Sequence, residues 1–363
     1  MFELEIFEIV NILAVVIGFV FGFVAQQKQF CFSGSIKDYI HTKSTKRAAS
    51  VVMAMIVAVI STALVSSYFD LDLSQSNYYR SNINYFAIIV GGLMFGAGMM
   101  IADGCSSRSL VKFAQGDSNA IITLVFIAIF AFATTRGILS GVFNPFINNE
   151  TLINLSSYID NFKVNIYVAL AILFILLAIF TKKIKRVFSL IDGVIIGLLI
   201  SVAWFVTGYI GAESFERNIE LSSISFVYPS ARALEFVTSY NLTELSFGVC
   251  LIFGALSGTY ISTFFNKKYS FGCTANKGIN KVKYNMVGGA LMGVGGIMAI
   301  GCTVGQGLSG LSTLAFSSFL AISSIFISGF ITGKILHKKN KLAMCFIFEW
   351  EDEKRENPIN YQI

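Results

Sequence analysis

Charged residues are scarce in this 363-residue chain, at 13%, whereas hydrophobic residues make up 55% and the mean hydropathy is +0.70. A soluble globular domain carries about a quarter charged residues, so this scarcity excludes an ordinary soluble fold. It also argues against nucleic-acid binding, despite the net charge of +6. Apolar runs close to membrane-spanning length recur from end to end. The sequence therefore predicts an all-α polytopic membrane protein in a lipid bilayer.

Proline and histidine are rarer still. With only three prolines, breaks in the predicted helices must rely on glycine. The two histidines, His41 and His337, and the absence of any Cys-x-x-Cys pair argue against a Cys/His zinc site. No P-loop, H-E-x-x-H or G-x-S-x-G motif occurs. The sequence indicates neither an enzyme of those classes nor a cofactor.

The apolar runs predict nine transmembrane helices. They cover approximately residues 7–25, 48–69, 85–102, 120–140, 164–180, 190–210, 245–265, 286–300 and 311–336. We expect one transmembrane domain over 1–345, with halves of about 1–140 and 188–336 joined by a helix near 164–180. Residues 346–363 are expected to form a charged cytoplasmic tail.

Lysine and arginine cluster after every odd-numbered span, whereas acidic residues such as Glu150, Asp160 and Glu213 follow the fourth and sixth spans. Basic residues mark the cytoplasmic loops of a membrane protein. This alternation predicts an outer N-terminus and a cytoplasmic C-terminus.

One stretch occurs twice, as GGLMFGAGMMIADGCSSRSL from Gly91 and as GGALMGVGGIMAIGCTVGQG from Gly288. The copies align without gaps at an offset of 197 residues, and each ends its apolar run in Gly-Cys, at Cys105 and Cys302. The copies fall in the third and eighth spans, an odd number of spans apart, so they run in opposite directions. This pattern indicates an inverted repeat, which commonly places a substrate site near the midplane.

The polar residues after each Gly-Cys predict re-entrant segments that line a pathway. Gly104 and Gly301 would allow the backbone to turn within the membrane, and Gln306 would face the cavity. Arg108 either supplies charge for an anion or simply marks the cytoplasmic surface. The simpler alternative is a pair of tight turns between closely packed helices, but this does not explain why cysteine recurs at the same place.

Cysteine is soft, polarizable and a weak hydrogen-bond donor, which suits a sulfur anion that must be held loosely and passed on. The candidates are Cys31, in QKQFCFSG, together with Cys105 and Cys302, while Cys273 is intermediate. Any single buried cysteine can instead be a small core hydrophobe, and we expect that role for Cys250 and Cys345.

The motifs ADGCSSRSLVKFAQG, GCTVGQGLSG and QKQFCFSG resemble those of the YeeE/YedE family of sulfur-compound transporters. The resemblance covers roughly residues 16–335. It implies thiosulfate uptake across the bacterial cytoplasmic membrane through a nine-span inverted repeat, with Cys31, Cys105 and Cys302 as pathway thiols. Some relatives work with a small cytosolic sulfur carrier of the TusA type, and a separate partner of that kind stays open here.

Asp103 stands where the resemblance leads us to expect a small residue. Another sulfur or selenium species therefore stays open as the substrate. Two further classes of function also stay open. One is a membrane enzyme that transfers sulfur through a cysteine persulfide, which needs a reactive thiolate. The other is a non-catalytic membrane scaffold.

Overall fold

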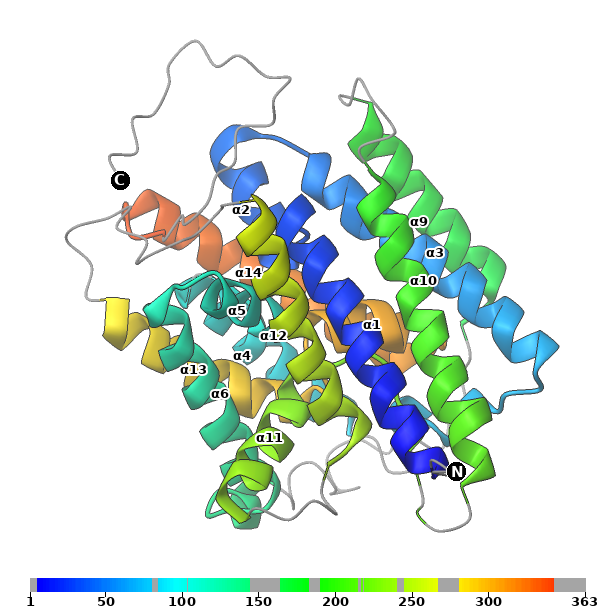
Figure 1. Ribbon diagram of the computed structural model, residues 1–363. Helices are drawn as coiled ribbons and strands as arrows, with labels where there is room; N and C mark the ends of the chain where they lie inside the picture. The colour runs from blue at the N-terminus through cyan, green and yellow to red at the C-terminus, as the bar shows by residue number, and fades with distance from the viewer. Residues whose placement is uncertain are drawn as a thin grey trace.

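The computed structural model describes residues 5–79, 84–102, 104–143, 164–182, 190–214, 217, 219–239, 245–266 and 281–342. Within these ranges the chain forms helices and connecting turns and no strand (Figure 1), which confirms the all-α prediction. The α-helices are α1 Ile6–Lys28, α2 Phe32–Thr42, α3 Lys46–Tyr68, α4 Tyr85–Ile101, α5 Ser106–Ala114, α6 Ser118–Thr135, α9 Ile166–Thr181, α10 Ile191–Phe205, α11 Val227–Ser239, α12 Phe247–Asn266, α13 Lys281–Met298 and α14 Phe316–Lys338.

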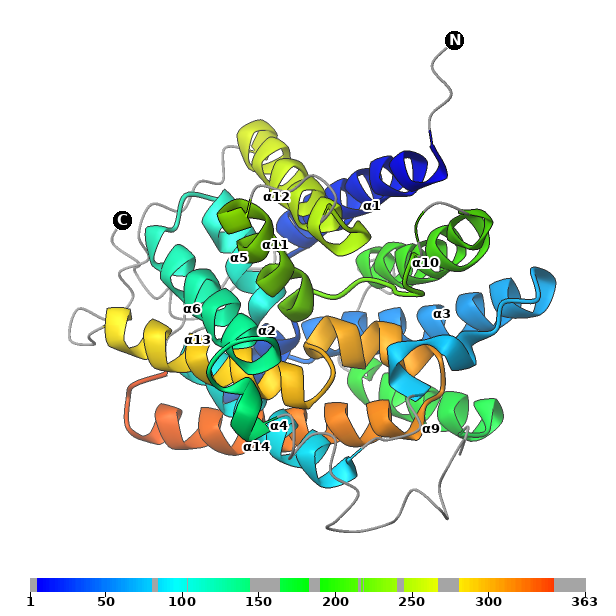
Figure 2. The ribbon, with the colours of Figure 1, turned by 90° about the horizontal axis from the view of Figure 1, so that it is seen from below.

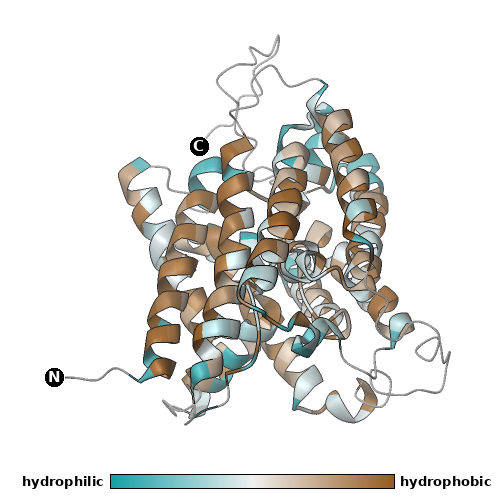
Figure 3. Ribbon diagram, turned by 90° about the vertical axis from the view of Figure 1, so that its right-hand side faces the viewer, coloured by the Kyte–Doolittle hydropathy of each residue, from teal (hydrophilic) through white to brown (hydrophobic). Residues whose placement is uncertain are grey.

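Seven helical stretches of the described residues are long and apolar enough to cross a membrane. Their apolar residues run along the length of the helices (Figure 3). Each of the nine predicted spans overlaps one helix, but two of these helices are not among the seven. α9 is apolar and only 16 residues long, and α13 begins with Lys281 and Lys283. Among the described residues, length and hydropathy thus support seven crossings, and the predicted count of nine stays a prediction.

The two glycine repeats pack against each other where α4 crosses α13. A Cβ atom added to Gly91 would lie 2.8 Å from the Gly295 carbonyl oxygen, and one added to Gly98 would lie 2.7 Å from that of Gly288. A Cβ atom added to Gly295 would lie 2.6 Å from the Gly91 carbonyl oxygen, and one added to Gly288 would lie 2.7 Å from the Gly98 carbonyl oxygen. Because the early glycine of each copy meets the late glycine of the other, the two helices cross antiparallel with their backbones in contact.

The remaining long helices form matched pairs around this crossing. In the first pairing, α1 packs against α12 and α10 packs against α3; in the second, α4 packs against α14 and α13 packs against α6. The ribbon views show the same neighbours (Figures 1 and 2). If α1 corresponds to α10, α3 to α12, α4 to α13 and α6 to α14, the two contacts within each pairing are equivalent. α9 stands outside this scheme and packs on α3.

Short polar helices lie inside the bundle. In α5, residues 106–112 are all buried, and all six residues of the π-helix η7 (Gly305–Gly310) are buried as well. The 3₁₀-helix η2 (Asn77–Tyr79) and an extended segment ahead of α11 bring further polar groups inward. Irregular backbone at such depth persists only where protein or a polar cavity surrounds it. These segments bring the cysteines and hydroxyls into the interior.

Candidate functional site

Cys31 begins the short helix α2. The helix α1 ends where Gln29 adopts a left-handed conformation, with φ of 58°. The chain then turns, and Cys31 takes the N-cap position of α2. There its sulfur accepts a hydrogen bond from the Gly34 amide at 3.3 Å and lies 3.1 Å from the Ser33 hydroxyl oxygen. The thiol therefore satisfies a helix amide that would otherwise lack a partner.

Cys302 repeats this geometry in the second half of the chain. The α13 end turns through Ile300 at φ 57° and Gly301 at φ 157°, a conformation that glycine adopts without strain. The Cys302 sulfur then accepts a hydrogen bond from the Gly305 amide at 3.3 Å. Both thiols thus accept from the amide of a glycine three residues later.

Cys105 links the two halves. It is the N-cap residue of α5, and its sulfur lies 3.2 Å from the Ser107 hydroxyl oxygen. Its thiol lies near that of Cys31 and near the Thr303 side chain, which is next to Cys302. Cys31 is 4% exposed, and Cys105 and Cys302 are fully buried. Cys31 and Cys302 are 271 residues apart in sequence, yet the fold places all three predicted thiols in one interior region.

Two buried arginines flank Cys31. The charges of Arg108 and Arg47 both act on its thiol, and both residues are at most 6% exposed. The Arg108 side chain folds over Gly104, where an added Cβ would lie 3.1 Å from its Cγ. Arg47 lies against Gly34 and pairs with Asp38 at 3.3 Å. Arg108 thus faces the cysteines rather than the surface, and Arg47 joins it although no pattern in the sequence indicates this.

Gln306 holds the turn that carries Cys302. Its amide nitrogen donates to the Ala299 carbonyl, across the end of α13, and its Oε1 atom is buried without a partner in the protein. The Ser106 hydroxyl, next to Cys105, likewise has no partner. Buried polar atoms are normally hydrogen-bonded, so the Ser106 hydroxyl has the capacity to donate to an anion or a water molecule, and the Gln306 oxygen to accept from a water molecule.

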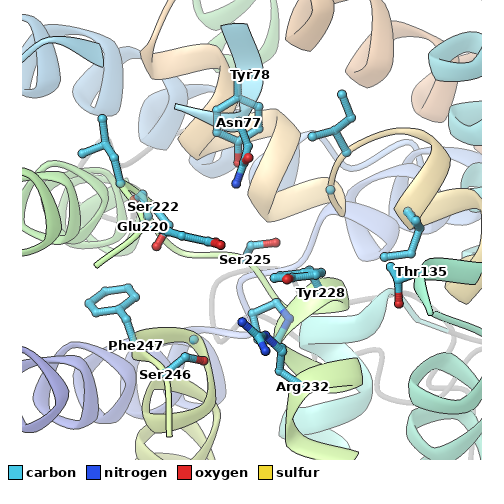
Figure 4. A pocket seen from close by; sticks show the side chains of 18 of the residues that line it. Asn77, Tyr78, Thr135, Glu220, Ser222, Ser225, Tyr228, Arg232, Ser246 and Phe247 are labelled. Atoms are coloured by element: carbon cyan, nitrogen blue, oxygen red, sulfur yellow. The ribbon is translucent and has the colours of Figure 1, made fainter. Parts of the chain in front are cut away.

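A cavity of about 710 Å³ reaches the Cys302 turn. Its walls come from the start of α1, the end of α13, the start of α12 and the segment that enters α11. Figure 4 shows Asn77 and Tyr78 facing Ser225, Tyr228 and Arg232 across it. Gly301 is one of its lining residues. Two arginines, Arg217 and Arg232, and one acid, Glu220, contribute to the lining, so the cavity carries more positive than negative side chains.

Tyr78 is the main site residue that sequence reasoning missed. Its hydroxyl donates to the Gly305 carbonyl at 2.9 Å, and its ring lines the cavity. Burial raises the pKa of the Tyr78 phenol above its ordinary value, so the hydroxyl stays protonated and keeps donating. No repeated pattern marks this tyrosine, which lies 227 residues from Gly305 in the chain.

Of the remaining cysteines, the structure describes Cys250, which is buried in the first turn of α12. Cys273 and Cys345 lie outside the described residues, as does Asp103, so Cys273 stays a prediction as a pathway residue.

Comparison with known proteins finds one matching family model, described as Sulphur transport, over residues 27–332. Among curated proteins, the chain is 27% identical over 338 residues to the thiosulfate transporter TsuA of Spirochaeta thermophila (strain ATCC 700085 / DSM 6578 / Z-1203), covering 86% of this chain and 94% of the relative. It is 21% identical over 333 residues to TsuA of Escherichia coli (strain K12), covering 84% and 88%. A 104-residue match at 27% identity joins it to the probable transporter YedE of the same strain, covering 29% and 24%.

Proposed function

Because the chain belongs to the Sulphur transport family, we propose that it carries thiosulfate or a closely related sulfur anion into the cell through a pathway lined by Cys31, Cys105 and Cys302. Curated relatives that match over most of its length are named thiosulfate transporters. Their names are those of transporters rather than enzymes, which leaves the persulfide-transfer alternative without support.

The observation that carries this proposal is the meeting of the buried thiols. Cys105 lies near Cys31 and also near Thr303, which is next to Cys302 in its turn. A neutral thiol is a weak donor to a sulfur or oxygen atom of the anion, so a series of thiols can bind it and release it again. Arg47 and Arg108 add positive charge at the Cys31 end, where the anion would otherwise lose its hydration without compensation.

The cavity supplies the entrance in this proposal. It extends from the start of α1 to Gly301, and the start of α1 is the outer end if the basic loops are cytoplasmic. The anion then meets Cys302 first, crosses to Cys105, and leaves past Cys31 and its two arginines. Arg217 and Arg232 favour entry of an anion by their charge.

We further propose that the architecture is an inverted repeat of nine crossings. The antiparallel α4–α13 contact and the matched helix pairs support this symmetry. So do the two sulfur caps, because Cys31–Gly34 and Cys302–Gly305 share one geometry in opposite halves. In this proposal the Gly-Cys segments are re-entrant, the N-terminus is outside, and the C-terminus faces the cytoplasm of a bacterium across its inner membrane. A TusA-like sulfur carrier at the cytoplasmic face is compatible with this arrangement.

Uptake of radiolabelled thiosulfate into proteoliposomes tests the proposal. Wild-type protein should accumulate label above protein-free vesicles, and Cys31→Ala, Cys105→Ala and Cys302→Ala should each reduce the initial rate toward that background. Cys250→Ala is the matched control, since Cys250 is also buried but lies in α12 away from the turns. It should keep the wild-type rate.

The outcomes test the proposed substrate and the proposed thiol pathway separately. Competent wild-type protein that takes up no thiosulfate contradicts the substrate, and competition by selenosulfate or sulfite in binding assays would then identify another anion. Normal uptake by all three cysteine variants leaves a transporter but removes the thiol pathway.

A further inference from the structure

Import of thiosulfate faces an electrical barrier. The inference drawn from this barrier rests on the proposed function. Thiosulfate is a dianion at neutral pH, and the bacterial membrane potential is negative inside. Two negative charges moving against 100 mV would equilibrate at a roughly 2,000-fold lower concentration inside. Passive uptake therefore needs rapid consumption of the imported thiosulfate inside the cell. A cation that enters together with the anion instead offsets the negative charge of the anion directly.

Asp192 has the surroundings of a proton-binding group. It stands in the first turn of α10 and is 3% exposed. Its Oδ2 atom accepts a hydrogen bond from the Ser50 hydroxyl of α3 at 2.6 Å, and its Oδ1 atom is buried without a hydrogen-bond partner. A carboxylate inside a membrane protein is costly and commonly marks a proton or ion pathway. A proton on Oδ1 would remove this cost.

The other buried acids of the described residues are committed to structural contacts. Asp38 pairs with Arg47 at 3.3 Å. Asp117 caps α6 by accepting from the Asn119 amide at 3.0 Å. Asp192 differs from both because its Oδ1 atom is buried without a hydrogen-bond partner, and its one side-chain partner is the neutral Ser50 hydroxyl.

The charged groups around Asp192 would let a proton leave as well as bind. From α1, the exposed Lys28 acts on its carboxylate, and the amides at the start of α10 lie close to it. From α3 comes Ser50, with Arg47 one turn earlier and already bound to Asp38. The π-helix Gly305–Gly310, which also packs on α10, has no charged residue. Lys28 and these amides lie where they would stabilise the carboxylate once the proton has left.

Asp192 also lies next to the proposed exit. Its partner Ser50 shares a face of α3 with Arg47, because residues three apart lie one above the other on a helix. Arg47 in turn lies against Gly34, in the first turn of the helix that Cys31 caps. An anion arriving at Cys31 therefore meets Arg47, and the charge on Asp192 opposes that anion unless a proton is bound.

We infer that Asp192 carries a proton that enters the cell with the sulfur anion. The proton binds Oδ1 from water in the pathway while the anion occupies the Cys31 and Arg47 region. It leaves to cytoplasmic water when the anion has left. One O–H bond forms and breaks, and no electron transfer is involved.

The test uses the full chain in proteoliposomes, with the potential clamped at zero by potassium and valinomycin. For one proton per anion, an inward gradient of one pH unit should raise the wild-type accumulation ratio of labelled thiosulfate about tenfold. Asp192→Asn should lose this effect but keep exchange of labelled for unlabelled thiosulfate. Asp117→Asn is the matched control, since asparagine also caps a helix, and it should keep the tenfold effect.

If the Asp192→Asn protein fails to fold, a second measurement on the wild-type protein tests the inference. Thiosulfate added to wild-type vesicles containing trapped pyranine should acidify the lumen. The inference is overturned if the wild-type protein takes up thiosulfate without acidifying the lumen, or if its accumulation ratio does not depend on the pH gradient. Neither result contradicts the proposed function. Absence of wild-type uptake and exchange overturns the proposed function and this inference together.

Discussion

At the scale of single residues, Tyr78 ties the Cys302 turn to the segment between α3 and α4. Tyr78→Phe removes the hydrogen bond to the Gly305 carbonyl and leaves the ring in place. The loss should cost about 1 kcal/mol of folding free energy. It should also lower the rate of thiosulfate uptake several-fold, because Gly305 supplies the amide that holds the Cys302 sulfur. Thermal unfolding in detergent and uptake by proteoliposomes measure the two effects.

Tyr79 provides the matched control for that change. Its hydroxyl donates to the Thr313 carbonyl at 2.6 Å, but its ring does not line the cavity. Tyr79→Phe should lower the unfolding temperature to a similar extent and leave uptake near the wild-type rate. Equal uptake losses in the two variants would show that Tyr78 acts only through general stability.

At the scale of elements, the α4–α13 crossing depends on direct contact between the two helix backbones at glycine residues. Gly98→Ala would place a methyl group 2.7 Å from the Gly288 carbonyl oxygen, and Gly295→Ala would place one 2.6 Å from that of Gly91. Each should lower the free energy of unfolding by about 1–3 kcal/mol, as overpacking does elsewhere. Since the two positions are equivalent under an inverted repeat, the losses should be similar. Thermal unfolding of the purified variants tests this.

Gly141→Ala is the control for the crossing, because an added Cβ there meets nothing within 4 Å. It should leave the unfolding temperature unchanged or slightly raise it. A large loss for Gly98→Ala combined with none for Gly295→Ala would contradict the symmetry on which the inverted repeat rests.

The sequence predicted the long helices well, because a membrane-spanning helix needs a continuous apolar run and the chain has little else. The repeated glycine spacing also drew attention to Cys105 and Cys302, since two copies of it are visible without a structure. The sequence could not predict α2 and η2, which are short, polar and without an apolar period. Nor could it place Arg47 beside Cys31 or Tyr78 beside Gly305. Those contacts depend on how the long helices pack, and no local pattern records that.

At the scale of the whole molecule, the number of crossings fixes which side each loop faces. Seven and nine are both odd, so the two ends of the helical domain lie on opposite sides in either case. The difference appears between α10 and α12. If α9 crosses, the chain leaves α10 on the outer side, whereas without that crossing it leaves α10 in the cytoplasm.

Alkaline phosphatase, which is active only outside the cytoplasm, can therefore decide between the two counts. A fusion after Glu213 should be active and one after Asn266 inactive, because the nine crossings of an inverted repeat place these ends outside and inside. A fusion after Thr135 should be active under both counts and serves as the control for expression. Reversed activities at Glu213 and Asn266 would mean that α9 does not cross. The α10 end would then lie in the cytoplasm, and the outer entrance assigned to the cavity could not hold, since Arg217 and Glu220 in its lining follow α10 directly.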